Sequence, residues 1–183
     1  MKVLDVGAGE AQMAKHYWPE AEIFSLDADP ATHPDLLGDL FSIPAPDGEY
    51  DRVLCSHVLE HVEYNRVVKA CVEMGRVLAE DGELHVFVPS LEWAARQVLS
   101  EKMSPITIMH LYGLQSTPWQ YHKAGFTLIL LRQVVTQAGL KVAAAQRATY
   151  WVTGTTRDGK DFKYPAEQHY VVGVKRANHV DNS

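Results

Sequence analysis

A glycine turn near the start of the chain is the first feature that could do chemistry. Residues 3–6 are Val-Leu-Asp-Val and lead into Gly7-Ala8-Gly9, and a helical pattern follows over residues 11–17. Glycine lets the backbone approach a ligand closely, and the free amides at a helix start attract a polar or anionic group. Such a turn either binds a nucleotide-like ligand or is an ordinary tight turn, and the motif alone leaves both possibilities open.

Two aspartates stand at the ends of the next apolar segments. Asp27 closes the segment 23–27, eighteen residues after Gly9, where a carboxylate can accept two ribose hydroxyls. Asp39 follows Gly38 and could accept the amino group of an adenine. Each acid alone could equally be a solvated residue at a strand end. Together, at the ends of successive strands, they outline an adenosine pocket.

The segment His57-Val58-Leu59-Glu60-His61 matches the HxxEH pattern of one class of zinc proteases. Two histidines four residues apart can share one face of a helix and bind a metal ion. Here, however, the segment directly follows a strand expected over residues 52–55, with only a short turn before residue 64. We therefore expect no metal site from this motif.

Two further histidines, His110 and His122, lie in the segment 89–126, which is rich in Pro, Trp, Tyr and His. Histidine titrates near neutral pH and can take a proton from a hydroxyl group, although either residue could instead be a structural or surface histidine. The same segment gathers aromatic side chains that could form an acceptor pocket, but packing onto the sheet is the more common role of such residues. These are Trp93, Tyr112, Trp119, Tyr121 and Phe126.

The elements that would position these residues alternate along the chain. Apolar segments predict strands over residues 2–6, 22–26, 52–55, 83–88, 141–150 and 168–174, with helices over 65–79 and 128–138 and a hairpin loop over 153–163. This alternation predicts an α/β fold: a Rossmann-like, doubly wound, mostly parallel sheet with an antiparallel C-terminal strand, in a three-layer α/β/α sandwich. Ligands bind such sheets at the carboxyl ends of the strands.

Composition places the chain among ordinary globular domains. Its 183 residues are 46% apolar and 22% charged, which suits one domain with a buried core. A net charge of −6 gives no general attraction for DNA or RNA, so we expect no nucleic-acid partner. No apolar run suits a membrane helix and no signal peptide is visible, so we expect no membrane contact and a cytoplasmic location. Cys55 and Cys71 are expected to be buried thiols.

Taken in order, the segments of residues 2–90 resemble the class I S-adenosylmethionine-dependent methyltransferases, and in particular the type 11-like group. The resemblance rests on Leu4-Asp5-Val6-Gly7-Ala8-Gly9, Leu26-Asp27, Gly38-Asp39-Leu40 with Ile43-Pro44, Tyr50-Asp51-Arg52-Val53, residues 56–62, Arg76-Val77-Leu78 and Asp81-Gly82-Glu83-Leu84. Residues 122–127 and 138–140 are similar to methyltransferases encoded near sugar-processing genes. Ala11 departs from the third glycine of the family's first motif. Related enzymes often have an N-terminal helix over the cofactor, so we expect a more open pocket or one that the segment 89–126 closes.

The resemblance implies S-adenosylmethionine as the cofactor and assigns residues to it. The glycine turn would face the methionine part, Asp5 would support its amino group, Asp27 would hold the ribose, and Asp39 with the amide of Leu40 would bind adenine. Residues after two of the strands would complete the pocket; these are Ala28, Cys55, Ser56 and His57, with Cys55 and Ser56 contributing backbone atoms. The implied cofactor-binding set in the turn is Gly7, Ala8 and Gly9.

From these features we expect one methyltransferase domain over residues 1–176, with 89–126 as an insertion over the active site and 177–183 as a flexible tail. The expected activity is methyl transfer to a small-molecule or glycan-like acceptor at a hydroxyl group, with His122 and His110 as candidate bases. One alternative is a catalytically inactive cofactor-binding or regulatory protein of the same fold. Another is a nicotinamide-dependent dehydrogenase, which Gln12 disfavours because a dinucleotide site would have its third glycine there.

Overall fold

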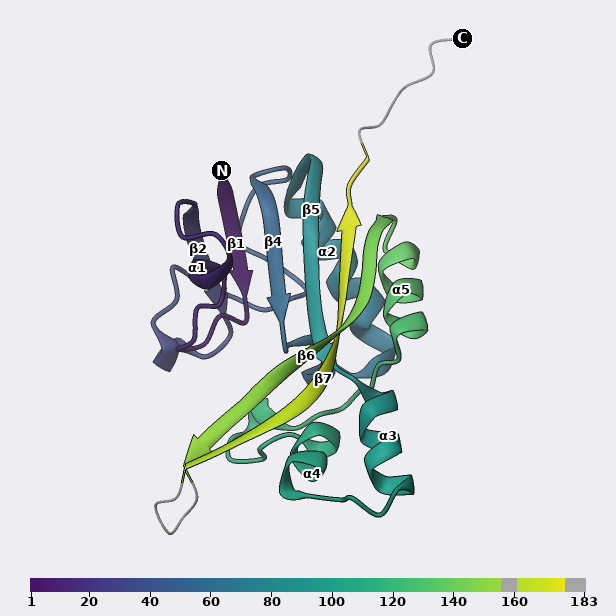
Figure 1. Ribbon diagram of the computed structural model, residues 1–183. Helices are drawn as coiled ribbons and strands as arrows, with labels where there is room; N and C mark the ends of the chain where they lie inside the picture. The colour runs from purple at the N-terminus through teal and green to yellow at the C-terminus, as the bar shows by residue number, and fades with distance from the viewer. Residues whose placement is uncertain (156–160, 177–183) are drawn as a thin grey trace.

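The chain is built around one seven-stranded sheet (Figure 1). The computed structural model describes residues 1–155 and 161–176. The strands are β1 (Lys2–Val6), β2 (Glu22–Asp27), β3 (Leu36–Leu37), β4 (Tyr50–Ser56), β5 (Leu78–Pro89), β6 (Lys141–Thr155) and β7 (Asp161–Val174). The α-helices are α1 (Ala14–Tyr17), α2 (Val67–Val77), α3 (Leu91–Leu99), α4 (Pro105–Tyr112) and α5 (Leu128–Gln137).

The strands lie in the order β3-β2-β1-β4-β5-β7-β6. Strands β1 to β5 pair in parallel, whereas β7 runs antiparallel to both β5 and β6. The chain winds outward from β1 to β3, crosses back to β4, and continues to the other edge, so the sheet is doubly wound. The predicted Rossmann-like α/β fold with an antiparallel C-terminal strand is confirmed. Its topological switch point lies between β1 and β4, where ligands bind in such sheets.

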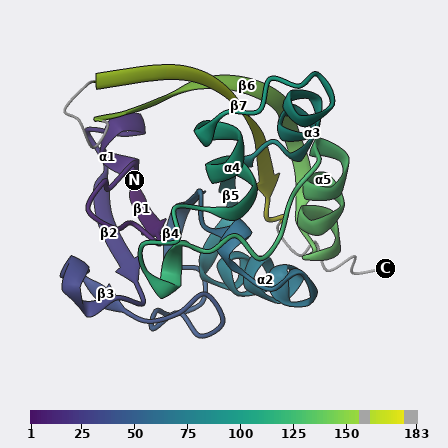
Figure 2. The same cartoon turned by 90° about the horizontal axis from the view of Figure 1, so that it is seen from below.

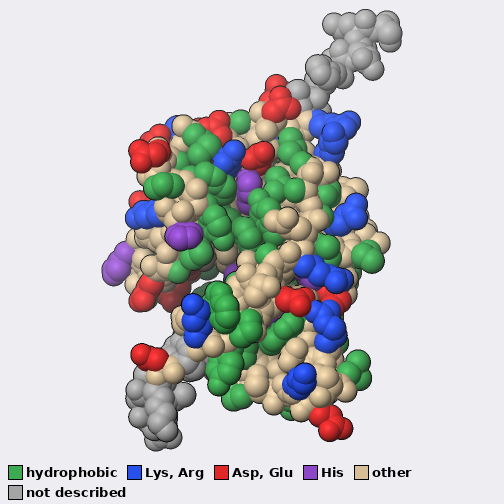
Figure 3. Space-filling view, viewed as in Figure 1, with side chains coloured by type: hydrophobic (Ala, Val, Ile, Leu, Met, Phe, Trp, Pro, Cys, Tyr) green, Lys and Arg blue, Asp and Glu red, His purple; other side chains and the backbone are tan. Residues whose placement is uncertain are grey.

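The two faces of the sheet carry unequal layers. Helices α2 and α5 cover one face, where Met74, Leu131 and Val135 are fully buried against the central strands. Among the described residues, the four-residue helix α1 is the only α-helix over the opposite face, where it packs through Ala14 and a small cluster around Phe87. Figure 2 shows the helices on both sides of the sheet, and Figure 3 shows apolar side chains gathered on the front, where α1 leaves the sheet open.

Two predicted boundaries were wrong for reasons of backbone conformation. The helix predicted over 65–79 ends at Val77, because Leu78 already pairs with Tyr50 as the first residue of β5. The Asp81-Gly82 pair lies in a bulge of that strand rather than before it, and Asp81 has a positive φ of 59°. The first helix starts at Ala14 and not at residue 11, since Gln12 has a left-handed φ of 42° that a right-handed helix excludes.

The hairpin loop predicted over 153–163 was also wrong in its extent. Thr153 pairs with Lys163 and Thr155 with Asp161, so β6 and β7 continue through most of that segment, and residues 156–160 lie outside the described part of the chain. The long hairpin leaves the sheet and swings across, below the carboxyl ends of β1 and β4 (Figure 1). The tail predicted over 177–183 also lies outside the described residues.

The segment 89–126 forms α3, α4 and the 3-10 helix Pro118–Gln120 at the carboxyl edge of the sheet (Figure 1). Ser90 and Ser104 cap the two α-helices with their side chains. Phe126 is 0% exposed and anchors the end of the segment in the core, where it bridges to Ser90. Cys55 and Cys71 are buried free thiols, as predicted. None of the helices within the described residues has the length and apolar character to span a membrane.

Candidate cofactor and acceptor site

The glycine turn and Asp27 lie together at the carboxyl ends of β1 and β2. The amide of Gly7 donates to the carbonyl of Leu26 over 2.7 Å, and the amide of Gly9 donates to Oδ2 of Asp27 over 2.9 Å. The amide of Asp29 donates to the other carboxylate oxygen, also over 2.9 Å. Two backbone amides thus orient the Asp27 carboxylate, and each oxygen keeps a lone pair for a ligand hydroxyl.

The turn depends on glycine at two positions for different reasons. Gly7 has a φ of +62°, and a Cβ atom there would come within 2.6 Å of Cγ2 of Val58. Gly9 has a φ of +49°, but a Cβ there would meet nothing within 4 Å. Gly7 therefore lets β1 and the segment after β4 approach closely, while Gly9 lies beside open space that a ligand can occupy.

Asp5 faces a different place from Asp27, on the α1 side of the sheet. Its side chain is buried, and Oδ2 accepts a 2.8 Å hydrogen bond from the amide of Ala14. Burial raises the pKa of this carboxyl group to about 6, although the Ala14 bond acts in the opposite direction. Asp5 lines a polar cavity between β1 and β2, together with Gln12, Lys15 and Ser25.

The Asp39 segment packs beside the same edge of the sheet. The amide of Phe41 donates to Oδ1 of Asp39 over 2.7 Å, and Leu40 is partly buried against the main core. The guanidinium group of Arg76 on α2 holds the following loop, because it donates to the carbonyls of Ile43 and Ala45 over 2.9 Å each. This loop therefore has a defined position relative to β2 and β4.

The residues at the end of β4 divide between the core and the carboxyl edge of the sheet. Cys55 is fully buried, and burial raises the pKa of its thiol well above the usual value, so its side chain belongs to the core. Ser56 is partly exposed at the strand end. His57 has a φ of 58°, and its Nε2 lies 2.8 Å from Oε1 of Gln168 on β7. Ala28, at the end of β2, is likewise partly exposed.

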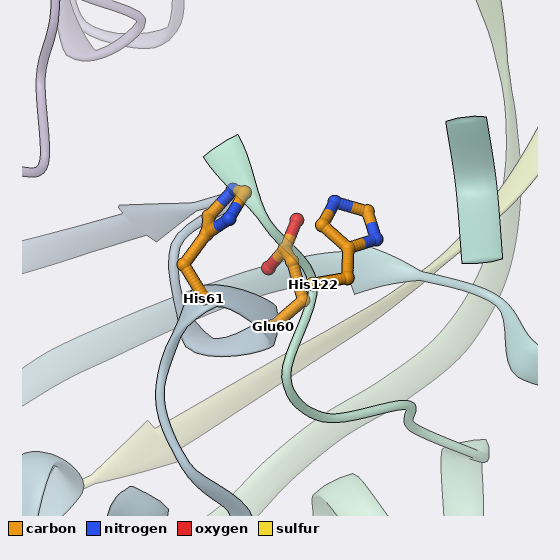
Figure 4. Close-up of side chains that lie close together, drawn as sticks. All are labelled: Glu60, His61 and His122. Atoms are coloured by element: carbon orange, nitrogen blue, oxygen red, sulfur yellow. The ribbon is translucent and has the colours of Figure 1, made fainter. Parts of the chain in front are cut away.

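Glu60 connects the β4 end to the segment that carries His122. The amides of Lys123 and Ala124 donate to the Glu60 carbonyl over 2.7 Å and 3.1 Å, which brings His122 beside the Glu60 side chain. Figure 4 shows the Glu60 carboxylate between the rings of His61 and His122. The other carboxylate neighbour is His57, whose Nδ1 lies 3.5 Å from Oε1 of Glu60.

The pKa values of the paired residues His57 and Glu60 move in opposite directions. Burial disfavours the charged form of His57, but the hydrogen bond and charge of Glu60 outweigh it, so the pKa of His57 is raised. Burial would raise the pKa of Glu60, but His57 lowers it below its usual value. Each residue of the pair thus favours the charged form of the other.

His122 and His110, the two predicted bases, are neighbours with different surroundings. Nδ1 of His122 donates to the backbone carbonyl of His110 over 3.0 Å, and burial lowers the pKa of His122. His110 is itself buried in α4, where burial lowers its pKa to about 4. Its ring packs on Trp93, and Nδ1 lies 3.5 Å from the hydroxyl of Tyr150. Both histidines line a small cavity together with Glu60.

The predicted aromatic cluster separates into two groups. Phe126 is completely buried, whereas Trp119, Tyr112 and Tyr121 are about half exposed at the carboxyl edge. Sequence reasoning missed Tyr150 and Gln168, which the β6–β7 hairpin brings beside His110 and His57. No local pattern marks these two residues, because each lies about ninety positions or more from His57 in the sequence.

The part of the chain that carries the glycine turn and Asp27 matches a known protein family. Residues 4–86 match the family model described as a methyltransferase domain. These residues are a class I S-adenosylmethionine-dependent methyltransferase domain. S-adenosylmethionine is accordingly the cofactor of the methyltransferase domain, and the general activity is methyl transfer from it. No curated protein matches the chain in sequence.

Solved structures share the fold of the methyltransferase domain over nearly the whole chain. A SAM-dependent methyltransferase from Methanosarcina mazei is 14% identical with a TM-score of 0.68, covering 97% of this chain and 93% of that one. A candidate methyltransferase from Bacillus halodurans is 14% identical with a TM-score of 0.67, covering 96% and 93%. A candidate O-methyltransferase from Nostoc punctiforme is 18% identical with a TM-score of 0.59, covering 96% of this chain but 52% of that one.

Proposed function

We propose that the protein methylates a hydroxyl group of a small-molecule or glycan-like acceptor. The proposal rests on the position of the end of β4, which borders both the proposed cofactor site and a cavity under the insertion 89–126. Ser56 ends β4 beside the proposed cofactor site, and Glu60, four residues later, lies beside His122 in that cavity. A methyl donor and an acceptor can thus meet across the segment 56–60. The Nostoc punctiforme relative, named as an O-methyltransferase candidate, agrees with a hydroxyl acceptor.

The proposed cofactor residues suit S-adenosylmethionine by position. Asp27 would accept the ribose hydroxyls, because both of its oxygens are oriented by backbone amides. The glycine turn with Ala8 would lie against the methionine part, which the open space beside Gly9 permits. Asp5 would attract the amino group from the polar cavity beneath the turn. The remaining residues proposed to line the pocket are Ala28, Asp39, Leu40, Cys55, Ser56 and His57.

His122 suits the role of proton acceptor. Since a carbonyl can only accept, the bond to the His110 carbonyl places the proton of the neutral ring on Nδ1 and leaves a lone pair on Nε2. Burial lowers the pKa of His122, which favours the neutral ring that can accept a proton. When bound, the cofactor supplies an activated methyl group, and the protein has to align the acceptor oxygen and remove its proton. His110 holds His122 in position and is the second candidate base.

Calorimetric titration with S-adenosylmethionine tests the cofactor half of this proposal. Asp27→Ala should weaken binding about 10- to 100-fold, because a hydrogen bond to a carboxylate contributes about 1.5–3 kcal/mol. Asp51→Ala is the matched control, since its carboxylate accepts from the amide of Lys2 at the opposite end of the sheet. Equal affinity in the wild type and in Asp27→Ala would refute the pocket. Tighter binding of NAD than of S-adenosylmethionine would instead favour a dehydrogenase.

Release of S-adenosylhomocysteine tests the acceptor half. We expect turnover with hydroxyl compounds from a panel of sugars, glycosides and phenols, and its loss in His122→Ala while cofactor affinity is unchanged. Full turnover in His122→Ala would remove His122 from the mechanism. Absence of turnover with every acceptor, despite tight cofactor binding, would favour the inactive regulatory alternative.

A further inference from the structure

Three ligand atoms converge at the acceptor end of the proposed site. Glu60, His61 and His122 each offer one carboxylate oxygen or ring nitrogen, and these atoms all lie within 4.8 Å of one another. Glu60 and His61 come from the 3-10 helix Leu59–His61 after β4, and His122 comes from the far end of the insertion. Figure 4 shows the Glu60 carboxylate between the two imidazole rings, which lie edge to face at a centroid distance of 4.9 Å.

The hydrogen bonds of the two rings decide which nitrogens are free. Nδ1 of His61 lies 3.1 Å from the carbonyl of Tyr121, and Nδ1 of His122 lies 3.0 Å from the carbonyl of His110. A carbonyl oxygen can only accept, so both Nδ1 atoms carry a hydrogen. In a neutral imidazole the other nitrogen then has a lone pair and no hydrogen. The Nε2 atoms of both histidines are therefore acceptors.

The Glu60 carboxylate between the two rings also lacks a hydrogen-bond donor for one of its oxygens. Glu60 is 2% exposed, and its Oε1 faces Nδ1 of His57 at 3.5 Å. Its other oxygen, Oε2, is buried without a hydrogen-bond partner among the described residues. His57 does not compete for a metal ion, because its two nitrogens face Glu60 and Gln168. The Glu60 carboxylate thus lies close to two imidazole rings whose Nδ1 hydrogens are bound by carbonyls, an arrangement that a cation stabilises.

We propose that Glu60, His61 and His122 bind a divalent cation of the first transition row, with zinc preferred. Two imidazole nitrogens and one carboxylate oxygen are a common ligand set for catalytic zinc, and three protein ligands leave a fourth position open. Magnesium and calcium are disfavoured because they prefer oxygen ligands. Histidine ligands of metal ions characteristically donate their second N–H to a carbonyl or carboxylate, as His61 and His122 do here.

The local packing is compatible with closure around an ion. Zinc bonds of about 2.0–2.2 Å place tetrahedral ligands about 3.4 Å apart, so the side chains need only close in from separations of up to 4.8 Å. The amides of Lys123 and Ala124 fix the backbone next to His122 against the Glu60 carbonyl. The Lys123 ammonium group is held 2.9 Å from Glu63 rather than at the cluster. Nδ1 of His57 faces Glu60 from the other side.

This inference deepens the proposed function and rests on the proposed acceptor site. A cation in this place would bind the acceptor hydroxyl at its open position and lower the pKa of that hydroxyl. His122 would then be a ligand, and the hydroxyl proton would pass to His110, the second candidate base, whose Nε2 has no hydrogen-bond partner among the described residues of the same cavity. The HxxEH motif contributes Glu60 and His61 as ligands, but the second histidine is His122 instead of His57.

Titration of the chelator-treated, full-length protein with zinc sulfate tests the proposal without cofactor or acceptor. We expect one strong site per chain, weakened about 100-fold or more in Glu60→Gln, His61→Ala and His122→Ala. The matched control is His16→Ala, which removes an exposed histidine from α1 and should bind zinc as the wild type does. Circular dichroism shows whether each variant is folded, and Glu60→Gln preserves the shape of the buried side chain.

Cobalt(II) gives a second, spectroscopic readout, because a four-coordinate ion absorbs strongly in the visible range and a hydrated one does not. The proposal is overturned if zinc does not bind, if the three variants bind it as tightly as the wild type, or if His16→Ala weakens binding equally. Asp27→Ala should bind zinc normally, which separates this inference from the cofactor pocket. Methyl transfer that survives complete chelation would leave the proposed function standing with His122 as the base, and would refute a catalytic cation.

Discussion

A methyl group added at the two glycines of the turn should destabilise the protein to different extents. An alanine at either position must adopt a left-handed φ, which costs about 1–2 kcal/mol for a residue other than glycine. Gly9→Ala meets no atom within 4 Å, so this conformational cost is all that we expect there. Gly7→Ala also drives a Cβ to 2.6 Å from Cγ2 of Val58, and overpacking of this kind costs about 1–3 kcal/mol more.

The predicted free energy of unfolding therefore falls by about 1–2 kcal/mol in Gly9→Ala and by about 2–5 kcal/mol in Gly7→Ala. Urea unfolding at constant pH measures both, and with a slope of about 2 kcal/mol per molar the two midpoints should differ by roughly 0.5–1.5 M. Val58→Ala provides the internal test, because it removes the two γ-carbons and leaves the Val58 Cβ at 3.4 Å from the new methyl group.

In the Val58→Ala background, Gly7→Ala should cost no more than Gly9→Ala does in the wild type. The corresponding coupling energy in a double-mutant cycle is about 1–3 kcal/mol. Equal destabilisation by the two glycine substitutions, or an unchanged cost of Gly7→Ala when Val58 is shortened, would refute the close approach of the turn to the segment after β4. The affinity of the two glycine variants for S-adenosylmethionine, measured by calorimetry, should not follow the order of their stabilities, because Gly9 faces the open side of the turn.

Two further predictions concern charged groups near the cofactor edge. The native pKa of Asp5 is about 6, above the ordinary value of 3.8, so the folded chain keeps this proton where the unfolded chain has lost it. Stability should therefore fall by roughly 3 kcal/mol as the pH rises from about 4 to 6. Asp5→Asn should remove this fall and be more stable than the wild type at pH 7; parallel urea-midpoint profiles in the two proteins would contradict the assignment. Arg76→Met removes the bonds to the carbonyls of Ile43 and Ala45 and should lower the free energy of unfolding by about 2–4 kcal/mol. The exposed Arg132→Met on α5 is its control, and an equal effect of both changes on the thermal midpoint would show that the Arg76 bonds do not hold the loop.

The sheet was predictable because its determinants are local. Each buried strand is a short apolar segment between turn residues, and the helices α2 and α5 have a broad apolar face, so their order alone indicates a doubly wound parallel sheet. The boundaries that failed depend on backbone conformation and pairing. Gln12 delays α1 through its positive φ, and the pairing of Leu78 with Tyr50 ends α2 early. The residue types alone do not specify either event.

The hairpin illustrates a second kind of failure. Glycine, threonine and charged residues over 153–163 are typical of a loop, yet pairing such as Thr153 with Lys163 extends the strands past the sheet. A long two-stranded ribbon gains its stability from cross-strand contacts and from packing against the rest of the protein. Those contacts include Gln168 with His57 and Tyr150 with His110, which link the hairpin to residues far away in the sequence.

The residues of the proposed cofactor site can be located from the sequence alone. Gly7, Gly9 and Asp27 each follow an apolar strand, and parallel pairing brings the carboxyl ends of neighbouring strands to one edge whatever the details of packing. What lies opposite these residues depends on tertiary contacts. His122 lies beside Glu60 because the far end of the segment 89–126 returns to the end of β4, where the amides of Lys123 and Ala124 bond to the Glu60 carbonyl. Such a meeting depends on hydrogen bonds between distant segments, and residue spacing carries no information about them.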